Sequence, residues 1–189
     1  QDGVVFKFDD VQYGKSLGNT SHHFRNGIAF KVKNDSVETT LKNIEYTIGK
    51  TGVLTPTAVF ESVEIEGTAV ERATLHNISI MKELLGNPWI GQKIGVFKAN
   101  LIVPAIRWGE IDNHTTKRQY IPIPTHCPIC HQPTTIKKDN DSEVLICTNE
   151  YCEGKLLKRL SHAVSKNALN IENLSEASLK RFIQLGYIK

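Results

Sequence analysis

The four cysteines of this 189-residue chain all lie in one stretch, CPICHQPTTIKKDNDSEVLICTNEYC. Cys127 and Cys130 are separated by two residues, Cys147 and Cys152 by four, and sixteen residues lie between the pairs. Each short turn can present two thiolates to one ion, and the hairpin between them can bring the second pair round. The spacing therefore predicts a zinc module with these four cysteines as metal ligands.

Two disulfides are the alternative, and four cysteines permit three pairings. Disulfides belong to oxidising compartments. The chain shows no signal-peptide pattern and no apolar run near the roughly 20 residues that span a bilayer. We therefore favour zinc in a cytoplasmic protein. Four thiolates leave no open position for water, which indicates a structural metal, so the flanking His126 and His131 are expected to be spectators. The metal should add folding energy to a segment too small for its own core.

Upstream of the cysteines, apolar and polar residues alternate with the period of half-buried strands. The runs VVFKFD and IAFKVK flank a polar loop, and five further runs follow: LKNIEYTIG, TAVFESVEIEG, TAVERATL, KIGVFKA and LIVPAI. One helix, IMKELL, interrupts them, with Asn77 or Ser79 as its cap and Gly86 as its stop. This pattern favours a small Greek-key barrel of the OB type, with an SH3-like barrel or an open sandwich as alternatives.

After Cys152 the apolar spacing becomes helical. One helix is expected to carry Leu156, Leu160 and Val164 on one face. A second should begin at Ser175 and end at Gly186, with Leu179, Phe182 and Ile183 inward. The expected fold class is mainly β with α at the C-terminus: an OB-fold β-barrel, a four-cysteine zinc finger and helix-hairpin-helix-type helices.

Charge is unevenly distributed along the chain, whose formal net charge is +3. Residues 154–189 contain seven Lys or Arg and two Glu, an excess of five that exceeds the surplus of the whole chain. A basic end fits a nucleic-acid partner, and it fits a solvated helix surface equally well.

Five segments, in this order, resemble the NAD-dependent DNA ligases of bacteria. DGVVFKFDD (2–10) is similar to motif IV and GIAFKVK (27–33) to motif V of that family. The segment 48–77 resembles the signature of its OB domain, and the cysteines match its zinc finger. The helices that follow resemble the start of its helix-hairpin-helix domain. The resemblance covers almost the whole chain, which is identified as a divergent member of this family.

The resemblance implies four parts. Residues 1–33 would be the C-terminal end of the nucleotidyltransferase (adenylation) domain, 34–118 the OB domain, 119–153 the zinc finger and 154–189 the start of the helix-hairpin-helix domain. The chain opens in mid-strand and without Met. We therefore expect a piece of a longer protein.

The family seals nicks in duplex DNA through enzyme-AMP and DNA-adenylate intermediates, with NAD and Mg²⁺. The resemblance implies that Lys7 and Lys31 are catalytic and cofactor-binding, as cations beside the adenylate phosphate. Asp2 matches the acid of motif IV and would organise the site or a magnesium ion. The family's nucleophilic Lys-x-Asp-Gly motif does not occur here, so this fragment alone is expected not to react with NAD.

Nicked duplex DNA is the implied partner of a monomer that does not bind membranes. Lys50, Thr51 and Lys98 are candidate DNA contacts, the lysines to phosphates. Ile102 and Val103 are candidate apolar contacts in the minor groove. Barrel core is the alternative for this pair, since strand alternation would point just one of them outward.

Several residues depart from the family pattern. Lys50 stands where Arg is usual, Asn26 where Trp is usual, and Asn100 in a run that normally contains glycine. Residues 173–175 read Asn-Leu-Ser instead of Gly-Leu-Gly. Such glycines let backbone amides approach a phosphate, so we expect a weaker DNA contact at this hairpin. A non-catalytic DNA-binding module, a degenerate ligase copy and a zinc-ribbon interaction protein remain alternative interpretations.

Overall fold

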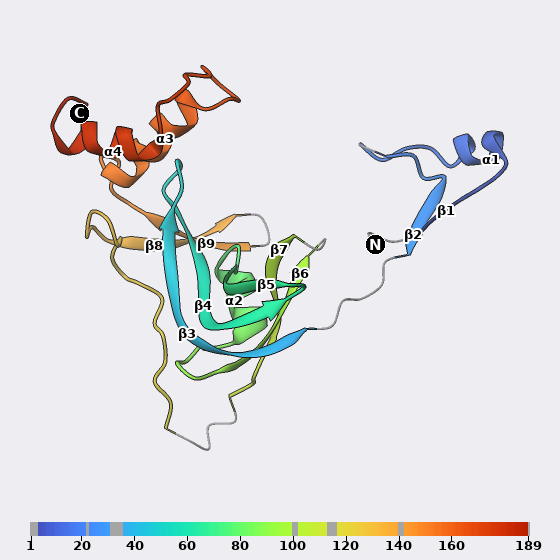
Figure 1. Ribbon diagram of the computed structural model, residues 1–189, viewed down its shortest axis with the longest axis horizontal. Helices are drawn as coiled ribbons and strands as arrows, with labels where there is room; N and C mark the ends of the chain where they lie inside the picture. The colour runs from blue at the N-terminus through green and yellow to red at the C-terminus, as the bar shows by residue number, and fades with distance from the viewer. Residues whose placement is uncertain are drawn as a thin grey trace.

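The computed structural model describes residues 4–21, 23–30, 36–99, 102–112, 117–139 and 142–188. The described chain is mainly β, and its two longest helices lie at the C-terminus, as predicted (Figure 1). The elements are, in chain order, β1 (Val4–Lys7), α1 (Val11–Ser16), β2 (Gly27–Phe30), β3 (Val37–Ile48), β4 (Val53–Ile65), β5 (Thr68–Thr74), α2 (Ile78–Leu85), β6 (Lys93–Ala99), β7 (Val103–Gly109), β8 (Thr134–Asp139), β9 (Ser142–Cys147), α3 (Glu153–Val164) and α4 (Glu176–Gln184).

Strands β3 to β7 close into a five-stranded barrel. β3 pairs with both β4 and β6, β4 pairs with β5, and β6 pairs with β7. The ring is completed by a parallel contact between Thr74 of β5 and Ala105 of β7. Helix α2 lies between the third and fourth barrel strands. This connectivity is that of the OB fold, so the OB expectation is confirmed and the SH3-like and sandwich alternatives are not.

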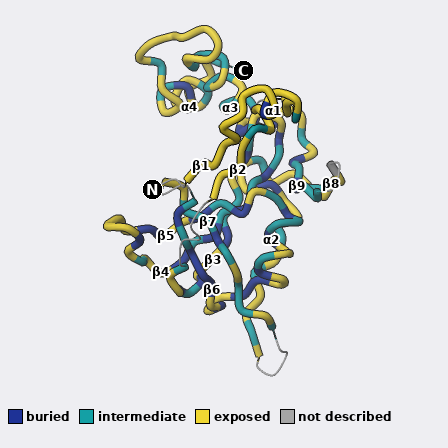
Figure 2. Tube along the Cα trace, turned by 90° about the vertical axis from the view of Figure 1, so that its right-hand side faces the viewer, coloured by how far each residue is buried: buried dark blue, intermediate teal, exposed yellow. Residues whose placement is uncertain are grey.

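Alternation along the strands builds the barrel core. On β4, Leu54, Ala58 and Phe60 point inward and are at most 1% exposed. On β3 the alternation is imperfect because the register shifts between Leu41 and Asn43. A bulge of this kind lets Leu41 and Ile44 both face the core. Figure 2 shows buried residues concentrated on these barrel strands.

Phe60→Ala is expected to destabilise the barrel by about 3–5 kcal/mol, because a fully buried aromatic side chain leaves a cavity. The measurement is the free energy of unfolding from denaturant titration of the metal-loaded chain. Glu61→Ala is the control, since Glu61 is the next residue on β4 and is exposed; it should change stability by about 0.5 kcal/mol or less. Equal losses in the two variants would contradict this placement of Phe60.

The ends of α2 match the sequence signals. The Asn77 side chain accepts a hydrogen bond from the Ile80 N–H at 2.9 Å, so Asn77 is the N-cap. Ser79, the alternative cap, does not cap the helix. Its Oγ accepts a hydrogen bond from the Glu143 N–H at 2.7 Å and so connects the helix to β9. Gly86 ends the helix with a φ of 63°, a conformation that favours glycine.

The cysteine segment is continuous with the barrel. β8 and β9 form a hairpin, and β9 also pairs with β4 through Val53 opposite Ile146 and Leu54 opposite Leu145. The result is one seven-stranded sheet. Cys127, Cys147 and Cys152 belong to the same buried cluster as the barrel residues. The expected small module without a core therefore shares the core of the barrel.

The N-terminal piece stands apart from the barrel (Figure 1). β1 and β2 pair antiparallel, with Lys7 opposite Gly27. The expected polar loop between them contains a short helix, α1, which the sequence interpretation missed; the Asp10 side chain caps it by accepting from the N–H groups of Gln12 and Tyr13.

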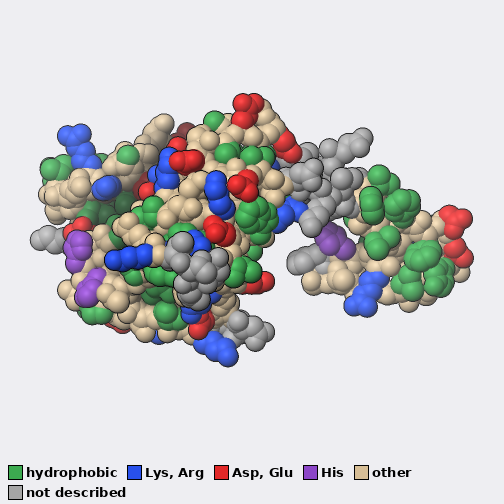
Figure 3. Space-filling model, turned by 90° about the horizontal axis from the view of Figure 1, so that it is seen from below, with side chains coloured by type: hydrophobic (Ala, Val, Ile, Leu, Met, Phe, Trp, Pro, Cys, Tyr) green, Lys and Arg blue, Asp and Glu red, His purple; other side chains and the backbone are tan. Residues whose placement is uncertain are grey.

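The two strands of this piece are apolar but remain open to solvent. Val5, Phe6, Ile28 and Phe30 are each at least 60% exposed. Figure 3 shows hydrophobic side chains on the surface of this part of the molecule, at the right of the view. Large apolar patches mark interaction surfaces, so this small sheet offers a face for another part of a protein.

The second of the two C-terminal helices, α4, begins and ends as predicted. Ser175 caps α4, with its Oγ accepting from the Ser178 N–H at 3.2 Å, and Gly186 follows the helix with a φ of 76°. Leu179 is buried, but the expectation for Phe182 was wrong, because it is 39% exposed. Phe182 instead contacts the ring of Tyr187 edge to face.

Among the described residues, no helix is long and apolar enough to cross a membrane.

Candidate metal centre and the turn beside it

The four cysteines converge on one point. Their Sγ atoms all lie within 4.8 Å of one another. The Cys127–Cys152 and Cys130–Cys147 distances are 4.0 and 3.6 Å. These distances exceed a disulfide bond of about 2.05 Å. They bracket the edge of about 3.8 Å that a tetrahedron with Zn–S bonds of about 2.3 Å requires. The donor set and its geometry therefore fit a metal ion such as zinc.

Local hydrogen bonds shape the turn at each cysteine pair. In the first pair, the His131 N–H donates to the Cys127 carbonyl at 3.0 Å, and the Cys127 N–H donates to the Gln132 carbonyl at 2.8 Å. In the second, the Asn149 side chain accepts from the Tyr151 N–H at 3.0 Å, and Cys152 is the N-cap of α3. Each thiol thus comes from a turn that local hydrogen bonds help to shape.

The thiols differ in proton affinity. Burial raises the pKa of Cys147 to about 12. Burial also acts on Cys130, but hydrogen bonds from the Gln132 backbone and the Asn149 side chain outweigh it and lower the pKa of Cys130 to about 7. A metal must displace protons from such thiols, so binding releases protons and affinity rises with pH.

His126 and His131 lie outside this cluster of ligand atoms. Both are exposed. His126 Nδ1 is 3.0 Å from Thr125 Oγ1. Their expected role as spectators agrees with this geometry.

The β3–β4 turn, Gly49–Gly52, lies directly against the metal centre. The Cys147 N–H donates to the Gly52 carbonyl at 3.0 Å. The Arg159 Nε of α3 donates to the Lys50 carbonyl at 3.2 Å. Lys50 and Thr51 are exposed at the tip. The structure thus brings two sequence-predicted DNA contacts beside the metal ligands, a proximity that the sequence interpretation missed.

The other predicted DNA contacts lie on β6, just before β7 and at its start. Ile102 and Val103 are 76% and 52% exposed, so both lie outside the barrel core. The alternative interpretation, barrel core, is therefore wrong for this pair. Lys98 is only 7% exposed and has an interaction partner within the protein. It offers a phosphate much less surface than Lys50 does.

Lys7 lies on β1 and is exposed. It lines a hollow together with Phe6, Phe8 and Arg25. Arg25 is a second cation that the sequence interpretation did not single out; a basic residue two positions before the GIAFKVK motif was the available signal. Lys31 and Asp2, the other two predicted catalytic residues, lie outside the described residues.

The sequence was compared with protein families and with individual proteins. Residues 38–118 match the model of the NAD-dependent DNA ligase OB-fold domain. The whole chain is 48% identical to a DNA ligase of Lachnoclostridium phytofermentans, 47% to one of Ruminiclostridium cellulolyticum and, over 188 residues, 37% to one of Bacillus cereus. Residues 38–118 thus match the OB-fold domain of NAD-dependent DNA ligases, and the whole chain is similar to one segment of these DNA ligases. It spans 28% of the length of each of these ligases.

The hairpin before α4 keeps one backbone conformation that favours glycine, at residue 173. Asn173 stands where glycine was expected and has a φ of 62°. Asparagine enters this left-handed region more readily than most residues. The substitution therefore preserves the backbone path at Asn173, and Ser175 supplies the cap of the next helix.

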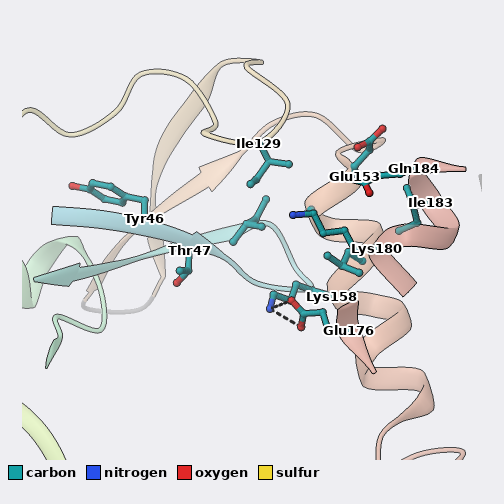
Figure 4. Close-up of a pocket in the computed structure, with 12 residues that line it drawn as sticks. Tyr46, Thr47, Ile129, Glu153, Lys158, Glu176, Lys180, Ile183 and Gln184 are labelled. Atoms are coloured by element: carbon teal, nitrogen blue, oxygen red, sulfur yellow. Dashed lines mark hydrogen bonds and ion pairs between the residues drawn. The ribbon is translucent and has the colours of Figure 1, made fainter. Parts of the chain in front are cut away.

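A pocket of about 300 Å³ lies where the barrel, the metal module and the helices meet (Figure 4). Ile48, Ile129, Leu157 and Ile183 supply its apolar lining. At its edge the Lys158 ammonium pairs with Glu176 at 2.7 Å and joins α3 to α4. The pocket thus lies between the barrel, the cysteine segment and the two C-terminal helices.

Proposed function

We propose that this chain is part of an NAD-dependent DNA ligase that seals nicks with a 5′-phosphate and a 3′-hydroxyl. In the parent enzyme it would supply DNA binding and part of the adenylate pocket, while the nucleophilic lysine lies elsewhere. The observation that carries the proposal is the similarity of the entire chain to DNA ligases. A cytoplasmic location follows as part of the same proposal.

The exposed sheet of β1 and β2 supports the adenylation role. Its apolar faces fit packing against the remainder of a nucleotidyltransferase domain, which would enclose the hollow lined by Lys7 and Arg25. NAD, when bound, supplies the adenylyl group. Lys7, together with Lys31, would hold negative charge that develops at the phosphate, where fixed cations are worth most in a site closed to water.

The Gly49–Gly52 turn supports the DNA-binding role. It presents Lys50 and Thr51 to solvent, and Ile102 and Val103 add an exposed apolar pair. Phosphate contacts would position the duplex, and the apolar side chains would enter the minor groove. The zinc held by the four cysteines would be structural. The domain boundaries at residues 33, 118 and 153 remain part of the proposal.

The first test is a binding titration of the chain with nicked and intact duplexes of one sequence, at two salt concentrations, with and without bound zinc. We expect a preference for the nick, an affinity that falls with salt, and loss of binding when zinc is removed. Binding without preference for the nick would favour the non-catalytic DNA-binding module instead.

Sealing itself is tested in a chimera. The Lachnoclostridium ligase would carry this chain in place of its own matching segment, to which it is 48% identical. Conversion of a nicked to a sealed strand with NAD supports the proposal. A chimera that folds and binds the nick but neither forms AMP-enzyme nor seals would support the degenerate-copy alternative.

Ile102→Glu is expected to weaken binding to nicked duplex about tenfold or more, because it places a carboxylate where an apolar side chain would meet DNA. Fluorescence anisotropy at constant salt measures the effect. Ile111→Glu is the matched control, with the same change of charge at a residue that is 88% exposed. Equal effects of the two variants would remove Ile102 from the proposed interface.

A further inference from the structure

Lys155, in the first turn of α3, is the most deeply buried lysine of the described C-terminal segment, residues 154–188. It is 6% exposed. Its Nζ donates a hydrogen bond to the carbonyl of Cys147 at 2.9 Å. Lys158, one turn later on the same helix, instead forms an ion pair with Glu176. The sequence interpretation counted Lys155 among the basic residues of the tail. In the structure its side chain is buried and does not add to the basic surface.

The Lys155 side chain passes directly over the Gly49–Gly52 turn. A Cβ built on Gly52 would lie 2.2 Å from Lys155 Cε and 2.8 Å from Nζ. Gly52 also has a φ of 91°, which favours glycine on backbone grounds alone. The carbonyl of Gly52 accepts from the Cys147 N–H. Cys147 is thus bonded through its N–H to the turn and through its carbonyl to Lys155.

The net charge of a loaded metal centre would stabilise the buried ammonium of Lys155. A divalent ion held by four thiolates carries a net charge of about −2. A buried ammonium is costly unless an opposite charge lies nearby. Among the described residues, no carboxylate pairs with Lys155, and its hydrogen-bond partner is the backbone of a predicted metal ligand. The loaded centre is therefore the natural counter-charge for Lys155.

We propose that Lys155 is a positioning residue that fixes the Gly49–Gly52 turn against the metal module. Metal occupancy would then determine the backbone conformation in which the turn meets DNA. The DNA part rests on the proposed function above. The coupling between metal, Lys155 and turn does not, and it can be measured without DNA.

A double-mutant cycle tests the contact between Lys155 and Gly52. Gly52→Ala should lower the melting temperature of the zinc-loaded chain more than Gly67→Ala does. Gly67 also has a positive φ, of 72°, but nothing lies within 4 Å of the Cβ that alanine would add there. Gly67→Ala therefore measures only the cost of placing alanine at a positive φ, without a steric clash. In a Lys155→Ala background the extra loss at Gly52 should disappear, because contacting residues are not additive. An unchanged difference would overturn the proposal.

Lys155→Met tests the coupling to the metal, with Lys158→Met as the matched control. Hydrogen exchange of the Cys147 amide, which donates to Gly52, reports whether the turn is held. We expect exchange about tenfold faster or more in zinc-loaded Lys155→Met, and a similar increase in the unaltered chain when zinc is removed. Lys158→Met should exchange like the unaltered chain. The same Cys147 protection in all three zinc-loaded proteins would refute the proposal.

Binding to nicked duplex separates this inference from the proposed function. We expect Lys155→Met to lose about tenfold in affinity and Lys158→Met to lose little. If the unaltered chain does not prefer the nick while the exchange result holds, the function fails and the coupling stands. If the turn is released and affinity is unchanged, the role of Lys155 in presenting the turn to DNA is refuted.

Discussion

Cys127→Ser is expected to abolish stable metal binding and to loosen the whole cysteine segment. Cys127 is fully buried, and its Sγ lies 4.0 Å from that of Cys152. Serine replaces a thiolate with a poor zinc ligand inside the shared core. We expect zinc affinity to fall by more than the roughly 10–100-fold that a lost outer-shell partner costs. Competition with a chromogenic chelator measures it.

The same variant should lose the stability that metal adds to the native state. That contribution is about 4 kcal/mol when free zinc is a thousand times its dissociation constant. Denaturant titrations with and without zinc measure it: the unaltered chain should be stabilised by zinc and Cys127→Ser should not. His126→Ala, at the neighbouring exposed residue, is the control and should behave like the unaltered chain. Zinc-independent stability of the unaltered chain would contradict a structural metal.

Lys7→Ala is expected to slow adenylation in the chimeric ligase by about 10²–10³-fold, because it removes a cation from developing negative charge. Formation of AMP-enzyme from NAD, followed in single turnover, measures the step. Lys7→Arg should restore part of the rate, since it keeps the charge but not the compact ammonium.

Lys15→Ala is the matched control for Lys7. Lys15 is also exposed and lies in the same N-terminal piece, in the last turn of α1. It should leave AMP-enzyme formation unchanged. If Lys7→Ala and Lys15→Ala have the same rate, Lys7 has no role at the phosphate.

Local signals in the sequence predicted most of the fold. The alternation on β4 and the Asn77 and Gly86 signals around α2 act within a few residues. The cysteine spacing is also a local signal, because a short turn determines which two thiols can face the same ion. The bulge between Leu41 and Asn43 is not local in this sense, because it depends on the paired strand.

The parts that sequence reasoning missed depend on distant partners. The pairing of β9 with β4 joins residues about ninety positions apart, and no local period encodes it. Lys155 reads as a surface lysine until Gly52 and Cys147 are seen beside it. Phe182 reads as inward, but the helical spacing cannot show that Tyr187 is its neighbour.

The pairing of β9 with β4 also bears on how the protein can be divided. The sequence boundary after residue 118 separates the OB domain from the cysteines, but the sheet continues across it. Cutting there would expose the edge of β4 at Val53 and Leu54 and remove Leu145 from the shared core. Unpaired, apolar strand edges recruit other chains. The isolated barrel is therefore a candidate for self-association, which the cysteine segment prevents by covering that edge.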